Sequence, residues 1–96
     1  MNLQIHSIKF DADKKLLDFV QKKVDKLETF SDRIVDGEVF LKLNNSGIDN
    51  KTAEIILNLP GDQLFSESSS RTFEVAIDEA TEALKSQIRK ARKKVS

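Results

Sequence analysis

The chain of 96 residues has no cysteine, no tryptophan and no tyrosine, and it has only one proline and three glycines. The lack of cysteine excludes disulfides and thiolate chemistry. Its apolar runs, such as residues 39–41 and 55–57, are only three residues long, far short of a membrane span. Residues 1–4 do not resemble a signal peptide. We therefore expect a cytoplasmic protein with one domain over residues 1–96, because this length allows one core.

The sequence offers no catalytic constellation. His6 is the only histidine, and scattered carboxylates around one histidine have no recognisable metal-ligand spacing. The three glycines are isolated, so no glycine-rich loop can hold a phosphate. The serines at 68–70 suit a cap or turn better than a nucleophile, and Asp78 suits an exposed helix face better than a general base. We expect no enzyme, no cofactor, no metal and no small-molecule substrate.

The net charge is zero, but the charges are distributed unevenly along the chain. Residues 85–96 contain six basic side chains and no acidic one. Residues 1–84 contain ten basic and sixteen acidic side chains, a net charge of −6. Such a chain presents one positive region to a partner and a negative surface elsewhere.

Hydrophobic periodicity predicts two helices and four strands. The strands are expected over residues 3–8, 34–44 and 53–59 and in a shorter segment at 64–65; the helices are expected over 13–28 and from a cap within 68–72 to 94. Asp11 or Asp13 can cap the first helix, Val35 is expected to face inward, and Gly37 could mark a bulge. One apolar stripe per helix and one apolar face per strand predict an α+β fold. This is a two-layer β-α-β-β-β-α sandwich, a four-stranded mixed sheet with both helices on one face. The first two strands should be parallel, because a helix connects them, and the others antiparallel.

The last predicted helix has its acidic side chains in its first half and its basic ones in its second half. Five of the basic residues form a feature that we call the basic ridge: Lys85, Arg89, Lys90, Arg92 and Lys93. At about 100° per residue, Arg89 and Lys93 should point away from the apolar stripe, with the other three beside it. Lys22 and Lys26 of the first helix extend the ridge if the two helices lie side by side.

The basic ridge predicts binding to a phosphate backbone, which releases counterions and depends steeply on salt. A solvated helix face is the alternative interpretation. The six phenylalanines are assigned mostly to the core or to strands, so base stacking is not expected. The ridge therefore fits folded RNA that is recognised by its shape and its phosphate positions.

The sequence resembles the ribosome hibernation promoting factor family, which includes the ribosome-associated inhibitor A type. Four segments carry the resemblance: Leu17-x-Phe19-Val20 followed by Lys22-Lys23-x-x-Lys26-Leu27, Asp32-Arg33-Ile34, Ala76-Ile77-Asp78, and Leu84-x-x-Gln87-Ile88-x-Lys90. It implies a protein on the small ribosomal subunit, in the channel used by messenger and transfer RNA, that excludes translation ligands and preserves inactive ribosomes in starved or stationary cells. By position it implies RNA contacts at Lys22, Lys23, Lys26, Arg33, Lys85, Arg89, Lys90, Arg92 and Lys93.

Three departures from the family accompany this resemblance. Thr72-Phe73 stands where the family often has Asp-x-Tyr, so a tyrosine hydroxyl contact is lost. The net charge of the chain is less positive than that expected of a strong RNA binder. The chain stops at Ser96, before the linker and second domain of long members, so it resembles the short form, is expected to be a monomer when free and should not pair ribosomes on its own.

Two other functions are alternatives to the ribosome-binding function that the resemblance implies. A generic double-stranded-RNA-binding module has a similar element order, but it usually has lysines at the start of its last helix, where this chain is acidic. A protein–protein adaptor would use the outer sheet face, where Phe40, Ile56 and Phe65 should lie, and exposed apolar residues there would favour a protein partner. A KH domain is disfavoured by the lack of a Gly-x-x-Gly loop, and an RRM by the lack of a platform of strand aromatics for base stacking.

Overall fold

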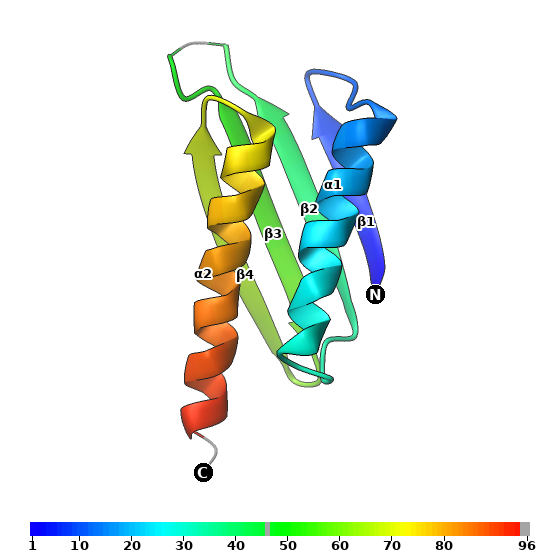
Figure 1. Ribbon diagram of the computed structural model, residues 1–96, viewed down its shortest axis with the longest axis vertical. Helices are drawn as coiled ribbons and strands as arrows, with labels where there is room; N and C mark the ends of the chain where they lie inside the picture. The colour runs from blue at the N-terminus through cyan, green and yellow to red at the C-terminus, as the bar shows by residue number, and fades with distance from the viewer. Residues whose placement is uncertain (46, 95–96) are drawn as a thin grey trace.

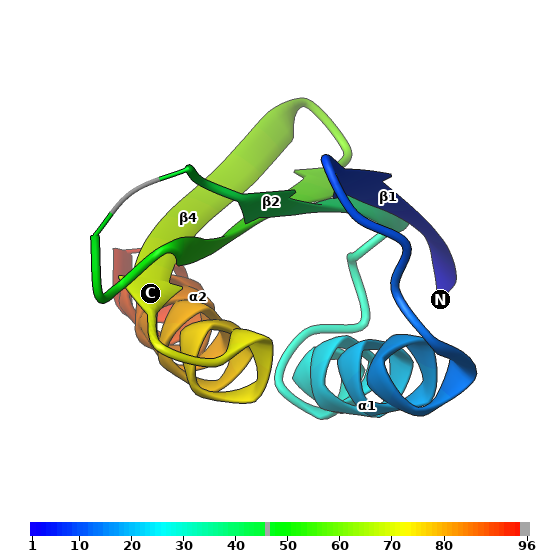
Figure 2. The same cartoon turned by 90° about the horizontal axis from the view of Figure 1, so that it is seen from above.

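The computed structural model describes residues 1–45 and 47–94, and it describes side chains as far as Lys90. Its elements are β1 (Asn2–Ile8), α1 (Lys14–Asp25), the 3₁₀ helix η1 (Lys26–Thr29), β2 (Asp36–Leu43), β3 (Lys51–Leu59), β4 (Asp62–Ser70) and α2 (Phe73–Lys94). The strands form one sheet in the order β1-β2-β3-β4 (Figure 1). Viewed from above, both helices cover the same face of that sheet (Figure 2). The predicted two-layer α+β sandwich is confirmed.

The strand pairing follows the predicted directions. β1 is parallel to β2, whereas the pairs β2–β3 and β3–β4 are antiparallel. The turn at Pro60 and Gly61 joins β3 to β4, and Gly61 adopts a φ of 72°, which a residue without a Cβ tolerates. Both helices therefore lie over a sheet whose first connection is a crossover and whose others are hairpins.

Side-chain caps fix the first turn of each helix. The Asp13 carboxylate accepts a hydrogen bond from the Leu16 amide at 2.9 Å, as predicted for one of the two aspartates. The Thr72 hydroxyl accepts from the Val75 amide at 3.1 Å and caps α2, within the predicted interval. Each cap satisfies an amide that has no partner inside its helix.

The fourth strand is longer than the sequence pattern predicted. β4 continues to Ser70 instead of ending near Phe65, so the serines at 68–70 pair with β3 and only Thr72 caps α2. Hydrophobic periodicity missed the continuation of this strand past Phe65 because its inward residues there are serines. Their hydroxyls are satisfied by α2: Ser66 donates to the Ala80 carbonyl at 2.8 Å, and Ser68 donates to Glu79 at 2.8 Å.

Two predictions about the start of β2 were wrong. Val35 is 59% exposed, while Ile34 is buried, because β2 begins only at Asp36 and the inward alternation starts there. Gly37 marks no bulge, since its register with β1 and β3 is continuous. A Cβ at Gly37 would lie 3.1 Å from the Ile56 carbonyl oxygen and equally close to two leucine side chains. Glycine is needed there for close packing.

The core lies between the sheet and the helices. Its fully buried large side chains are Val20, Val24, Val39, Leu41, Ile55, Leu57, Ile77 and Leu84. They come from α1, β2, β3 and α2, so both helices are fixed to the sheet by apolar burial. This burial sets the separation and orientation of the two helices.

The opposite surface of the sheet, which we call the outer sheet face, carries a charged triplet. Lys42 is hydrogen-bonded to Glu54, which lowers the pKa of the Glu54 carboxyl and raises the pKa of the Lys42 ammonium. Glu67 lies directly opposite Glu54 on β4. A hydrogen bond between the two carboxyls raises the pKa of Glu67, because the protonated form of Glu67 can donate to Glu54.

Replacing Glu67 by glutamine is expected to stabilise the protein at neutral pH. Because the pKa of Glu67 is raised on folding, its favourable contribution is complete below the ordinary carboxyl pKa and disappears as the pH rises through its folded pKa. A glutamine amide keeps the donor and has no charge, so Glu67→Gln should gain a few tenths of a kcal/mol at pH about 7, a small value because Glu67 is exposed. Urea unfolding at several pH values measures it.

The gain should vanish near pH 4, where Glu67 already carries its proton. Glu74→Gln, which removes an exposed carboxylate from the first turn of α2, should lack this gain. An equal gain for Glu67→Gln at both pH values would contradict the role of the carboxyl pair.

Candidate nucleic-acid interface

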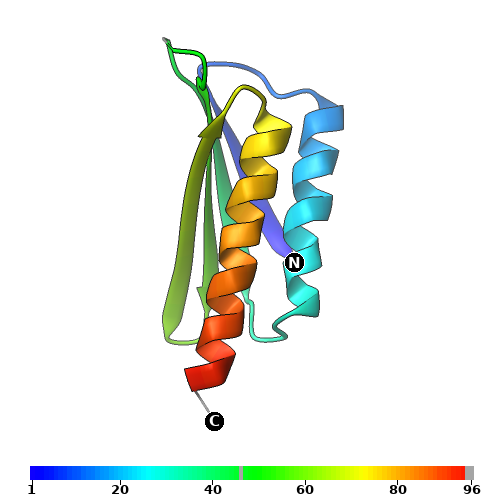
Figure 3. The ribbon, with the colours of Figure 1, turned by 60° about the vertical axis from the view of Figure 1, so that its left-hand side comes forward.

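The second half of α2 places basic side chains beside the end of α1 and η1. α2 and α1 run side by side over the sheet, and the last part of α2 extends past the end of the strands (Figures 1 and 3). Of the basic ridge, Lys85 is half-buried, whereas Arg89 and Lys90 are exposed. Arg92 and Lys93 belong to the last turns of α2, and their side chains lie outside the described part of the chain. The ridge therefore begins in contact with η1 and continues along a projecting helix end.

Phe30 joins the ridge to the first helix. It follows η1, and its ring lies 5.0 Å from the Lys85 Nζ and 5.6 Å from the Arg89 Cζ. Cations over an aromatic face are held by the ring quadrupole, with about 0.5–1 kcal/mol for each exposed contact. One ring thus orients two cations of the basic ridge. It keeps both charges at the same end of the molecule.

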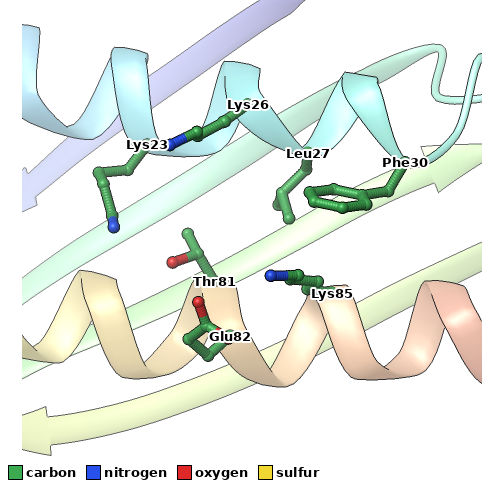
Figure 4. Close-up of a pocket in the computed structure, with 7 residues that line it drawn as sticks. All are labelled: Lys23, Lys26, Leu27, Phe30, Thr81, Glu82 and Lys85. Atoms are coloured by element: carbon green, nitrogen blue, oxygen red, sulfur yellow. The ribbon is translucent and has the colours of Figure 1, made fainter.

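A cleft of about 90 Å³ lies between the two helices at this position. Seven residues line it: Lys23, Lys26, Leu27 and Phe30 from one side, and Thr81, Glu82 and Lys85 from α2 (Figure 4). The volume is well below the roughly 300 Å³ of a typical small-molecule site. Three ammonium groups and one carboxylate border it. The cleft fits a phosphate group of an extended ligand better than an enclosed metabolite.

An ion pair connects the two helices beside the cleft. The Lys23 Nζ donates to Asp78 Oδ1 at 2.6 Å, between residues that are 55 positions apart in the sequence. Lys23 is half-buried and Asp78 is exposed on α2, as expected for an acid on a helix face. Part of the Lys23 charge is therefore used inside the protein, and the other lysines of the cleft are more available to an anion.

The structure brings together some of the residues that the sequence analysis selected. Lys23, Lys26 and Lys85 line the same cleft. Lys22 is exposed on α1 and does not line it. Arg33 borders a second hollow formed by residues 28–33, and this hollow meets the cleft at Phe30.

The predicted direction of Arg89 was wrong. It does not point straight away from the core, because its guanidinium lies over Phe30. Arg89 is one helical turn from Lys85, so both side chains face η1. The helical wheel gave its position relative to the apolar stripe of α2 and contained no information about the neighbouring element.

Phe30 is the residue of the interface that the sequence analysis missed. The sequence pattern assigns it to the core or the strands, whereas its half-exposed ring supports two cations. An aromatic residue directly after a lysine-rich helix is a weak signal in sequence. Its meaning depends on α2, which is far away along the chain.

Residues singled out for other chemistry have structural roles. The His6 Nε2 lies 3.1 Å from Glu38 Oε2, and its ring stacks on Phe40 with 4.8 Å between centroids.

Within residues 1–45 and 47–94, no group of three or more histidine, aspartate or glutamate side chains could hold a metal ion. Over the same residues, no helix is both long and apolar enough to cross a bilayer.

The fold matches solved structures over nearly the whole chain. A ribosomal subunit interface protein from Coxiella burnetii has a TM-score of 0.84 at 18% identity, covering 96% of this chain and 98% of that one. The N-terminal domain of Protein Y from Thermus thermophilus has a TM-score of 0.81 at 26% identity, covering 94% of this chain and 98% of that one. The two matches define the class of this fold: an α+β domain of the same architecture as these two solved proteins.

Residues 3–96 match the model of the Sigma 54 modulation protein / S30EA ribosomal protein family, and the chain belongs to that family. A curated relative is the ribosome hibernation promotion factor of Bacillus subtilis (strain 168), with 32% identity over 96 residues. The alignment covers all of this chain and 51% of the relative, so the chain spans about half the length of that protein. The resemblance inferred from the sequence is confirmed at the level of the family.

Proposed function

We propose that this protein binds small-subunit ribosomal RNA in the channel that messenger and transfer RNA occupy, and that it inhibits translation by stabilising inactive ribosomes. The family membership supports association with the ribosome, and the name of the Bacillus subtilis relative supports hibernation. In this proposal the protein is a cytoplasmic binding protein, a monomer when free and without catalytic activity. It acts under starvation or in stationary phase.

The observation that carries the proposal is the cationic end of the helix layer. Phe30 holds Lys85 and Arg89 next to a cleft that Lys23 and Lys26 also line. These charges come from two helices that the core fixes relative to each other, so little reorganisation is needed on binding. A site with cations at fixed positions and no surface for base stacking suits the phosphates of a folded RNA. The contact would continue along both helices through Lys22, Lys90, Arg92 and Lys93. It would extend beyond Phe30 through Arg33.

The charge along α2 argues against a generic duplex binder. Its first half carries Glu74, Asp78, Glu79 and Glu82. A module that used the start of this helix on a duplex would bring carboxylates to the phosphates, which repel them. The basic side chains of α2 begin at Lys85, in its second half, and Lys23 and Lys26 face that half across the cleft.

Co-sedimentation with separated ribosomal subunits and whole ribosomes tests the proposal. Binding to the small subunit and to whole ribosomes at low salt, with a steep loss at higher salt, is expected because each phosphate contact releases counterions. A translation assay should then show inhibition at saturating protein. Duplex RNA of unrelated sequence serves as the competitor.

Equal affinity for the small subunit and for unrelated duplex RNA would favour the generic module. Absence of binding at low salt would contradict the proposal, because the cations would then form only a solvated face. Binding to the isolated large subunit alone would contradict the proposed location.

A further inference from the structure

The outer sheet face has no covering element within the described part of the chain. Both helices lie on the other face, so the side chains at alternate positions of the four strands face outward (Figure 2). Four apolar residues are among them: Phe65 is 50% exposed, Ile8 at the end of β1 is 37% exposed, and Phe40 and Ile56 are half-buried. Ile56 and Phe65 are direct cross-strand partners. Phe40, Ile56 and Phe65 form an apolar strip across β2, β3 and β4.

Carboxylates surround this strip. The strand register places Asp36, Glu38, Glu54 and Glu67 on the outer sheet face, against Lys42 as its one lysine. His6 is paired with Glu38, and Lys42 is paired with Glu54. Glu67 takes part in none of the ion pairs among the described residues, although it faces Glu54 directly. The outer sheet face is therefore anionic, opposite in sign to the cleft between the helices.

Aromatic rings on an open sheet are a common platform for single-stranded nucleic acid. Here the surrounding charge has the wrong sign, since four carboxylates would repel phosphates. A guanidinium group satisfies both features at once. It stacks on aromatic faces and pairs with carboxylates through two parallel hydrogen bonds.

We propose that the outer sheet face binds an extended, arginine-rich polypeptide segment, whose guanidinium groups stack on Phe65 and pair with Glu67 and Glu54. Charge complementarity selects this occupant: a cation next to Glu67 would relieve its repulsion from Glu54, which Lys42 only partly offsets. The site is on the face opposite the helices, so a molecule bound to RNA through the helix layer keeps it accessible (Figure 2). This goes beyond the proposed RNA contact and does not require it.

The test uses the whole chain and a labelled peptide of alternating arginine and glycine, with fluorescence anisotropy at low and moderate salt. The double variant Glu54→Gln/Glu67→Gln should weaken binding by about tenfold, equivalent to about 1.4 kcal/mol. Phe65→Ala should weaken it several-fold, because the stacking surface is lost. A peptide with lysine in place of arginine should bind more weakly, since lysine cannot form the bidentate pair.

The matched control is Asp49→Asn/Glu74→Gln, which removes two exposed carboxylates away from the outer sheet face. It should change peptide affinity by less than about twofold, since exposed charges at a distance are screened. Equal weakening by both double variants would overturn the proposal, because overall charge would then explain binding.

Two further outcomes separate this proposal from the RNA-binding function. If Phe65→Ala weakens single-stranded oligouridine instead of the peptide, the face is a nucleic-acid platform and the proposal is overturned. Lys85→Glu/Arg89→Glu should remove ribosomal RNA binding and leave peptide affinity unreduced. Failure of one function with retention of the other therefore identifies which proposal is wrong.

Discussion

Changing Lys85, Arg89 and Lys90 together to glutamate is expected to lower affinity for small-subunit ribosomal RNA on the order of a thousandfold at low salt. The first two cations are held over Phe30, and Lys90 is exposed on the next turn of α2. Each phosphate contact contributes about one unit to the slope of log affinity against log salt, so the slope should fall by about three. A salt series of co-sedimentation or filter binding measures both quantities. Arg92 and Lys93 stay unchanged, because their side chains are outside the described part of the chain.

A second triple variant with the same change in net charge controls for long-range electrostatics. Lys9, Lys14 and Lys15 are exposed and belong to the start of α1 and the segment before it. Their conversion to glutamate should weaken RNA binding far less and should leave the salt slope nearly unchanged, because they are not among the proposed phosphate contacts. The control variant should unfold at nearly the wild-type urea concentration, and the α2 triple variant at a somewhat lower one, because it loses two contacts with Phe30 that contribute about 0.5–1 kcal/mol each. Equal losses of affinity would contradict a localised interface.

Local patterns predicted most of the fold because apolar periodicity reports which side chains face the core. The method failed where inward residues are polar. Ser66 and Ser68 of β4 face inward and are satisfied by α2, so the second half of this strand has no hydrophobic signal. It also failed at Val35, where alternation was extended past the start of β2.

The candidate site was predictable only in its charges. The assignment of Lys85 to the basic ridge needs only the pattern within one helix, and in the structure Lys85 lines the cleft. The supporting ring of Phe30 and the pair between Lys23 and Asp78 join residues far apart in the sequence. Their proximity is a consequence of how the core orients the helices, and no periodicity within one element contains it.

Leu84→Ala is expected to cost about 2–5 kcal/mol of unfolding free energy. Leu84 is fully buried between α2 and the sheet, and it directly precedes Lys85 of the basic ridge. Truncation removes apolar burial and leaves a cavity. The resulting loss of unfolding free energy is a large fraction of the about 5–15 kcal/mol that stabilises a typical domain. Urea unfolding should show a lower midpoint with an unchanged slope. Leu84→Met, which nearly conserves volume, should cost less than about 1.5 kcal/mol.

The comparison of Leu84→Ala with the α2 triple variant separates the architecture from the interface. Leu84 makes no contribution to the charge, so folded molecules of Leu84→Ala should bind ribosomal RNA with the wild-type salt slope at a temperature where they are fully folded. The triple variant should behave in the opposite way, with a reduced salt slope and a smaller loss of stability, at most about 2 kcal/mol from the two lost contacts with Phe30. A reduced slope for folded Leu84→Ala would mean that the packing of α2 against the sheet sets the number of phosphate contacts. In that case the orientation of Lys85 and Arg89 over Phe30, and not their charge alone, would determine affinity.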